Sequence, residues 1–139
     1  MIRFKDARNI VLRHVLRRSA SDLRLDHGHN GVLAEDIRAT VDGPEFDKSV
    51  MDGFAVKSSD VRKSPAVLKI VEFIPAGKLP LRRIKKGECA KIATGACLPR
   101  GADAVVIKED TRFLNNDQVE VLKSVQRSKN IYRKGCDYK

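Results

Sequence analysis

Apolar and polar residues follow two different periods along this chain, and together they predict one helix followed by several strands. From Phe4 to Arg18 the apolar residues recur every three or four positions, as expected for an amphipathic helix. Arginines, among them Arg13 and Arg17, occupy its last turns, where cations complement the helix dipole. We expect this helix to end at Ser19 to Ser21, and it is the only long helix that the pattern predicts.

Beyond the loop His27 to Gly31, the period shortens to that of β-strands. An uneven alternation predicts a strand from Val32 to Val41, which ends at Gly43-Pro44. Five shorter strands follow, each bounded by Gly, Pro, Asn or Asp: Phe54 to Lys57, Ala66 to Ile74, Glu88 to Ala93, Ala104 to Lys108 and Val119 to Val125. The sequence Asn115-Asn116-Asp117 joins two apolar runs and predicts a hairpin turn. The pattern therefore predicts an α+β, mostly β fold, with two small subdomains separated by long excursions between strands.

Composition favours an ordinary globular domain. The 139 residues are 42% hydrophobic and 33% charged, and no apolar run approaches the ~20 residues that a membrane helix needs. The N-terminus is interrupted by charge every few positions and lacks the continuous apolar centre of a secretory signal. We therefore expect a cytoplasmic protein that is neither membrane-spanning nor disordered.

The chain is strongly basic, which restricts its partners. With 28 basic and 18 acidic residues, its formal net charge is +10 and its sequence pI is about 9.8. Nucleic acid, phosphorylated small molecules and oxyanions would all be attracted to such a charge. Aromatic residues make up only 5% of the chain and Trp is absent, so little is available for base stacking. We therefore favour an anionic small molecule over nucleic acid.

Cysteines and histidines give no evidence for a metal site. Cys89, Cys97 and Cys136 are widely spaced and include no CxxC pair, so we expect reduced thiols rather than disulfides or a zinc site. His27 and His29 lie in the loop HGHNG, but no further ligand lies nearby in the sequence.

An acidic cluster is the most conspicuous local feature. Asp42, Glu45, Asp47 and Asp52 lie within eleven positions of this basic chain. Carboxylates this close repel one another unless a cation or a basic neighbour compensates them. Two interpretations remain open: Asp52, placed at the turn before Gly53, faces a metal ion or a polar ligand, or the cluster is a solvated loop that leads into a strand.

A second candidate segment runs from Ile92 to Asp110. Thr94 places a hydroxyl beside the small residues Gly95 and Ala96, an arrangement that lets backbone amides and a ligand approach one another. The next residues, Pro99 to Gly101, are explained more simply as a turn. The patterns GxxxxGK[ST], GxGxxG and GxSxG are all absent, so neither a standard nucleotide-binding loop nor a nucleophile elbow is predicted.

Three segments carry a family resemblance. PEFDKSVMDGFAV (residues 44–56) resembles the signature P-x-F-D-x-S-x-M-D-G-[YF]-A-V of the molybdopterin molybdenumtransferase family, the MoeA proteins and the E domain of gephyrin. IATGACLPRGADAVVIKED (92–110) and NIYRKGCDY (130–138) are similar to its I-x-T-G-A-x-[LV]-P-x-G-A-D-A-V-V-x-x-E and N-I-R-x-x-G-E-D-I. We name these the first, second and third motifs.

The resemblance implies an N-terminal helix and bent, coiled β-sheets in two subdomains, about 1–42 with 126–139 and about 43–125. It implies that the molybdopterin-binding domain and the C-terminal domain of the family lie outside this chain. It also implies active-site roles for Asp52, Thr94 and Asp137, with Asp52 and Asp137 as ligands of a cation. Ser49 and Gly95 would contribute to cofactor binding, and Ser49 would also orient the loop. Lys48 would attract anions.

The activity that the resemblance implies is insertion of molybdenum from molybdate into adenylylated molybdopterin, a transferase step of molybdenum cofactor biosynthesis that uses Mg²⁺. Family members work as homodimers, and the molybdopterin adenylyltransferase is an expected partner. We expect the isolated chain to be inactive. The alternative is a non-catalytic dimerisation or interaction module of the same fold.

Three departures from the family pattern bear on these expectations. Cys136 stands where the family usually has Glu, Tyr138 where it has Ile, and Ala93 where Met is common. Loss of a carboxylate beside Asp137 lowers the local negative charge and weakens a cation site at the third motif.

Overall fold

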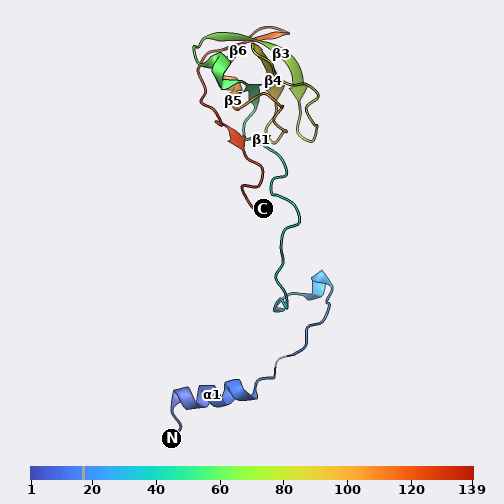
Figure 1. Ribbon diagram of the computed structural model, residues 1–139, viewed down its shortest axis with the longest axis vertical. Helices are drawn as coiled ribbons and strands as arrows, with labels where there is room; N and C mark the ends of the chain where they lie inside the picture. Colours follow the sequence, from blue (N-terminus) through green and yellow to red (C-terminus); the bar gives the residue numbers. More distant parts are fainter. Residues whose placement is uncertain (17) are drawn as a thin grey trace. The chain divides into compact units, whose positions relative to one another are not determined.

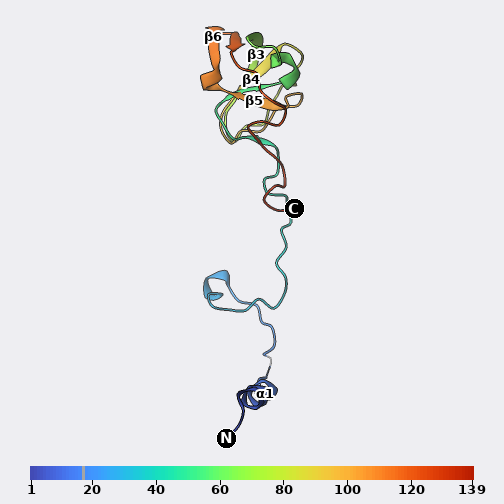
Figure 2. The same cartoon turned by 90° about the vertical axis from the view of Figure 1, so that its left-hand side faces the viewer.

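The computed structural model describes residues 1–16 and 18–139, and these separate into two units, Met1–Arg38 and Ala39–Lys139. The first unit contains helix α1 (Phe4–His14) and the 3-10 turn η1 (Leu25–His27). The second contains all the strands (Figures 1 and 2). One helix followed by a mostly β unit confirms the predicted fold class. No helix among the described residues is long and apolar enough to cross a membrane.

Helix α1 is shorter than the sequence pattern predicts. It ends at His14, and the backbone of Val15 is already extended (φ −75°, ψ 115°), so the predicted end at Arg18 is wrong. Arg17 lies outside the described residues. The His14 ring nitrogen Nδ1 lies 2.8 Å from the Ile10 carbonyl oxygen, a contact that satisfies a carbonyl of the last turn. None of the helix residues is buried in this unit, so no packing extends the helix beyond its intrinsic propensity.

The strand predicted from Val32 to Val41 is wrong. These residues have no strand assignment, and all of them are exposed. A strand needs a neighbour to accept and donate its backbone hydrogen bonds, and none of the described strands pairs with this segment. The alternation of apolar residues is therefore not enough to make this segment a strand.

The second unit is built on a curled six-stranded sheet. The strands follow the order β5-β2-β4-β3-β7-β6, and their bounds are β2 (Gly53–Val56), β3 (Ala66–Ile74), β4 (Glu88–Ile92), β5 (Ala104–Ile107), β6 (Thr111–Asn115) and β7 (Gln118–Val121). All neighbours are antiparallel except β3 and β4, which run parallel. The rings of Phe54 on β2 and Phe113 on β6 meet edge to face, 5.6 Å apart. Because three strands separate β2 from β6 in the sheet order, this contact shows that the sheet curls back on itself.

Five of the predicted strands are thus confirmed, with shifts at their ends. The last of them ends at Val121 rather than Val125. The hairpin at Asn115-Asn116-Asp117 is also confirmed, and the Asp117 amide donates to the Asn115 side chain at 2.9 Å. The sequence pattern missed β6 and two short strands, β1 (Lys48–Ser49) and β8 (Ile131–Tyr132). Strands β1 and β8 form a separate two-stranded sheet.

Two hydrophobic clusters lie on opposite faces of the central strands. Phe54, Val56 and Cys89 belong to one cluster, whereas their neighbours Ala55 and Ala90 belong to the other. Every residue of β2 is buried. Burial on both faces explains why β2 and β5 are continuous apolar runs rather than alternating ones.

The C-terminal segment lies in the second unit, against the first motif. Gly43 forms a β-bridge with Tyr138, and β8 pairs with β1. The grouping of residues 1–42 with 126–139 as one subdomain stays a prediction.

Candidate functional site

The three motifs meet around strand β1. On one side, the Ser49 amide donates to the Ala96 carbonyl at 3.0 Å and the Gly95 amide donates to the Ser49 carbonyl at 2.8 Å. On the other side, Lys48 lies opposite Tyr132 and Ser49 opposite Ile131 in the β1–β8 pair. The first motif therefore lies between the second and the third, although it precedes both in the chain.

Asp52 and Thr94 form the best-defined polar contact of the site. Asp52 immediately precedes β2 and Thr94 closely follows β4, and these strands pair with Gly53 opposite Ile92. The Thr94 amide donates to Asp52 Oδ1 at 2.7 Å, and Thr94 Oγ1 donates to the same oxygen at 2.9 Å. Within the described residues, Asp52 Oδ2 accepts no hydrogen bond from a side chain or backbone group. The exposed side chain therefore offers one carboxylate oxygen to a ligand.

Electrostatics keep this carboxylate ionised. The backbone and then the side-chain hydrogen bond from Thr94, with a smaller contribution from the charge of Lys108, lower the pKa of Asp52 below its usual value. A charged oxygen with an open position is what a hard cation such as Mg²⁺ prefers as a ligand.

Thr94→Val tests this electrostatic assignment. Removing the hydroxyl leaves only the amide donor, so the pKa of Asp52 should rise part of the way to its usual value. Because the folded-state pKa lies below the unfolded one, the stabilisation from this pair is present above the unfolded-state pKa and is lost as pH falls through the folded-state pKa. A pH titration of the Asp52 carboxyl carbon by NMR measures the shift. Thr94→Ser, which keeps the hydroxyl, should titrate like the wild type; an unchanged pKa in Thr94→Val would refute the assignment.

Ser49 and Gly95 shape the loop that precedes Asp52. The Ser49 side chain is almost fully buried, and its Oγ donates to the Met51 carbonyl at 2.6 Å and accepts from the Met51 amide at 3.3 Å. Gly95 adopts a positive φ of 79°, a conformation that favours glycine. The Ser49 hydroxyl thus orients the loop, as its sequence context suggests, whereas direct cofactor binding by Ser49 and Gly95 stays a prediction.

Asp137 lies in a different part of the site from the Asp52–Thr94 pair. Its carboxylate accepts a hydrogen bond from the Tyr132 hydroxyl, and this bond raises the pKa of Tyr132. Its amide donates to the Gly43 carbonyl at 2.8 Å. No hydrogen bond or ion pair among the described residues joins Asp137 to Asp52 or Thr94. Lys48 Nζ lies 5.2 Å from the centroid of the Tyr132 ring, so this lysine contacts the third motif.

The acidic residues suit Mg²⁺ only as part of a larger ligand set. Within residues 1–16 and 18–139, no group of three or more His, Cys, Asp or Glu side chains could hold a metal ion. Mg²⁺ nevertheless commonly binds through one or two carboxylates together with substrate phosphates and water. Asp52 fits that arrangement as a single ligand. For Asp137 the role of ligand stays a prediction, since its carboxylate already binds the Tyr132 hydroxyl.

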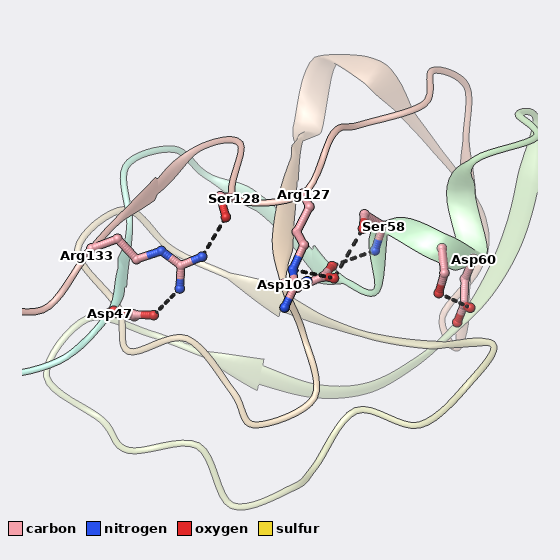
Figure 3. A network of polar contacts seen from close by, with 8 residues as sticks. Asp47, Ser58, Asp60, Asp103, Arg127, Ser128 and Arg133 are labelled. Atoms are coloured by element: carbon pink, nitrogen blue, oxygen red, sulfur yellow. Dashed lines mark hydrogen bonds and ion pairs between the residues drawn. The ribbon is translucent and has the colours of Figure 1, made fainter.

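Asp47 joins the first motif to the third, a contact that the sequence did not reveal. Its carboxylate forms an ion pair with Arg133 and accepts the Lys134 amide at 2.9 Å. Arg133 also donates to Ser128 (Figure 3), and Lys134 pairs with Asp42 at 3.2 Å. Two members of the acidic cluster are thus compensated by basic neighbours and hold the third motif in place. Asp47 and Arg133 lie 86 positions apart in the sequence, so no local sequence pattern predicts their ion pair.

The three thiols should differ strongly in reactivity. Cys89 is fully buried, and burial raises its pKa to about 12. Burial and the nearby charge of Asp47 raise the pKa of Cys97, whereas Cys136 is exposed. The thiolate is the reactive species, so Ellman's reagent at pH 8 should label Cys136 first. Cys89 should react at least about 100-fold more slowly, because it becomes accessible only when the protein unfolds. Comparable rates for Cys89 and Cys136 in the native protein would contradict this order.

Comparison with known proteins identifies the family. The sequence profile described as MoeA N-terminal region (domain I and II) matches residues 2–139, and the chain belongs to this family. It is 39% identical over 124 residues to a protein of Staphylococcus aureus named molybdopterin molybdenumtransferase, a match that covers 86% of this chain and 29% of that protein. A protein of Nostoc with the same name is 44% identical over 89 residues, covering 61% of this chain and 20% of that protein.

Solved structures agree with the sequence matches. A crystal structure of the molybdopterin biosynthesis MoeA protein from Pyrococcus horikoshii has a TM-score of 0.73 and 35% identity, covering 78% of this chain and 29% of that one. This chain thus spans about a fifth to a third of the length of the proteins that it matches.

Proposed function

We propose that this chain is the N-terminal part of a molybdopterin molybdenumtransferase, which inserts molybdenum from molybdate into adenylylated molybdopterin during molybdenum cofactor biosynthesis. The observation that supports this function best is the Asp52–Thr94 pair. It joins two motifs of the family at an exposed position and leaves one charged oxygen available. Such a pair is suited to a cation that accompanies a phosphorylated substrate.

Each residue of the pair has a separate task in this proposal. Asp52 Oδ2 ligates Mg²⁺, while Thr94 fixes the carboxylate through Oδ1 and keeps it ionised. A bound Mg²⁺ would neutralise charge on the substrate phosphates and on molybdate. Asp137 contributes from the third motif, with its orientation set by the Tyr132 hydroxyl.

The proposal includes a homodimer in the cytoplasm, with the molybdopterin adenylyltransferase as a further partner. Exposed apolar side chains on the first unit support the dimer. Phe4, Val11 and Leu12 on α1 are all more than half exposed, and a second copy would cover this apolar stripe. Sedimentation equilibrium of a full-length protein that carries this region should give a dimer; a monomer at micromolar concentration would refute this part.

A chimera tests the proposed function. Residues 1–139 replace the corresponding region of the Staphylococcus aureus relative, and cofactor is measured by activation of a molybdenum-free apoenzyme. The chimera should form cofactor from adenylylated molybdopterin and molybdate, whereas the isolated 139-residue chain should form none. A folded, dimeric chimera without activity would overturn the assignment, and activity of the isolated chain would overturn its dependence on the remaining domains.

One observation favours the alternative of a non-catalytic dimerisation or interaction module. Cys136 replaces the usual Glu of the third motif, and the neighbouring Asp137 carboxylate is bound by Tyr132 within the chain. Less negative charge remains there for a cation than the family pattern would supply. Under this alternative the chimera folds and dimerises but forms no cofactor.

A further inference from the structure

The connection between the parallel strands β3 and β4 carries a concentrated positive charge. We call residues 75–87 the basic loop. It contains five cationic residues and no acidic one, and all five are exposed: Lys78, Arg82, Arg83, Lys85 and Lys86. None of the five forms an ion pair within the part of the chain that the structure describes. The five cationic side chains are therefore left without a direct ion-pair partner in the described part of the chain.

Carboxylates do lie beside the basic loop, but they bind its backbone. Glu72 accepts the amides of Leu81 and Arg82 at 2.8 and 3.0 Å. Glu88 accepts the Lys85 amide at 2.9 Å, and Asp60 accepts the Gly87 amide at 2.7 Å. These acids fix the path of the loop while its cationic side chains stay exposed to solvent.

A buried residue anchors the loop to the sheet. Ile84 is 1% exposed and packs in the cluster that contains Ala55 and Ala90. Its amide donates to the Arg100 carbonyl at 2.8 Å. A side chain on Gly101 would come within 2.3 Å of the Ile84 carbonyl oxygen, so the two backbones are in close contact. The backbone of the basic loop is thus fixed, and the loop would lose little conformational entropy when a partner binds it.

Exposed apolar groups accompany the charge. Leu79 and Leu81 are 72% and 91% exposed. At the Lys86 end of the loop lies a hollow of about 470 Å³ whose lining includes Val67, Arg62 and Lys63. The surface thus combines two exposed leucines with neighbouring cations, which distinguishes it from a simple solvated charge run.

We propose that the basic loop docks an acidic, leucine-containing peptide segment of a partner protein. The carboxylates of such a peptide would pair with Arg82 and Arg83, and its apolar side chains would cover Leu79 and Leu81. Complementary charge of this kind speeds association and selects the partner. Nucleic acid fits less well, because the loop contains no aromatic residue for base stacking and its leucines gain nothing from a phosphate backbone.

Fluorescence anisotropy on the 139-residue chain tests the proposal. The probes are a short fluorescein-labelled peptide of Asp, Glu and Leu, a matched peptide with Ser in place of each Leu, and a single-stranded DNA oligonucleotide of equal charge. The leucine peptide should bind tightest. Arg82→Glu with Arg83→Glu should weaken it at least about tenfold, and Leu79→Ser with Leu81→Ser about fivefold.

The matched control is Lys5→Glu with Arg8→Glu, which changes the net charge equally on exposed positions of the first unit. It should alter the affinity by less than about twofold. If this control lost as much affinity for the leucine peptide as Arg82→Glu with Arg83→Glu, the peptide would be attracted by net charge alone and the proposal would be overturned. Equal binding of the serine peptide, or tighter binding of the oligonucleotide through the loop, would overturn it as well. All the substituted side chains are exposed, and an unchanged near-UV circular dichroism spectrum verifies the fold of each variant.

Discussion

Asp52→Ala in the chimera with the full-length relative should lower the rate of cofactor formation by about 100-fold or more. The substitution removes the charged oxygen that the Asp52–Thr94 pair leaves available, and a preorganised charge that acts on a transferring group is typically worth that much. The measurement is the initial rate at saturating Mg²⁺ and substrate.

Asp52→Asn separates ligation from loop structure. The amide oxygen of Asn can still accept both hydrogen bonds from Thr94, so the loop is kept while the charge is lost. A loss similar to that of Asp52→Ala assigns the effect to the charge, and partial rescue by raised Mg²⁺ would support ligation. Asp117→Asn, an exposed acid in the β6–β7 hairpin outside the three motifs, is the control and should keep full activity. Activity of Asp52→Asn and Asp52→Ala close to that of the unsubstituted chimera would refute the proposed role of Asp52 as a cation ligand.

The sequence predicts strands well where their apolar side chains are buried in the core. The prediction of β3 matches its observed bounds, and the predictions of β2 and β5, made from short segments bounded by turn residues, differ from the observed strands by at most one residue at either end. The sequence pattern fails where a strand forms only because a neighbouring strand pairs with it. Val32 to Val41 alternates like a strand but has no neighbour, whereas β1 and β8 are two residues each and exist only because they pair with one another. Strand β6, with exposed Phe113 and Leu114, likewise depends on β7.

The candidate site shows a similar division. The family resemblance singled out Asp52 and Thr94 as candidates, and the geometry brings them together although they are 42 positions apart. The sequence could not show that Asp47 pairs with Arg133, because the two residues are 86 positions apart and come together only through the pairing of β1 with β8. This contact holds the third motif against the first, so the residues that position the site were harder to predict than those that would bind a ligand.

Gly53→Ala should destabilise the second unit by about 3 kcal/mol, because overpacking against backbone cannot be relieved by a rotamer change. A Cβ at Gly53 would lie 1.9 Å from the Val106 carbonyl oxygen and 3.0 Å from the Ile107 Cα. Both atoms belong to β5, which pairs with β2 at this point, so the two strands would have to separate. The same displacement would move the adjacent Asp52 and disturb its contact with Thr94.

Urea unfolding of the 139-residue chain measures the loss, as a lower midpoint with an unchanged m-value. Gly77→Ala is the matched control: no atom lies within 4 Å of its added Cβ, but its φ of 79° makes any side chain strained, which costs about 1 kcal/mol. The control carries the backbone strain without the steric clash, whereas Gly53, which has no positive φ, would carry the clash without that strain. A larger loss in Gly53→Ala than in Gly77→Ala therefore reports the close approach of β2 and β5. If Gly53→Ala proved no more destabilising than Gly77→Ala, the β2–β5 register and the place that it gives Asp52 would both be wrong.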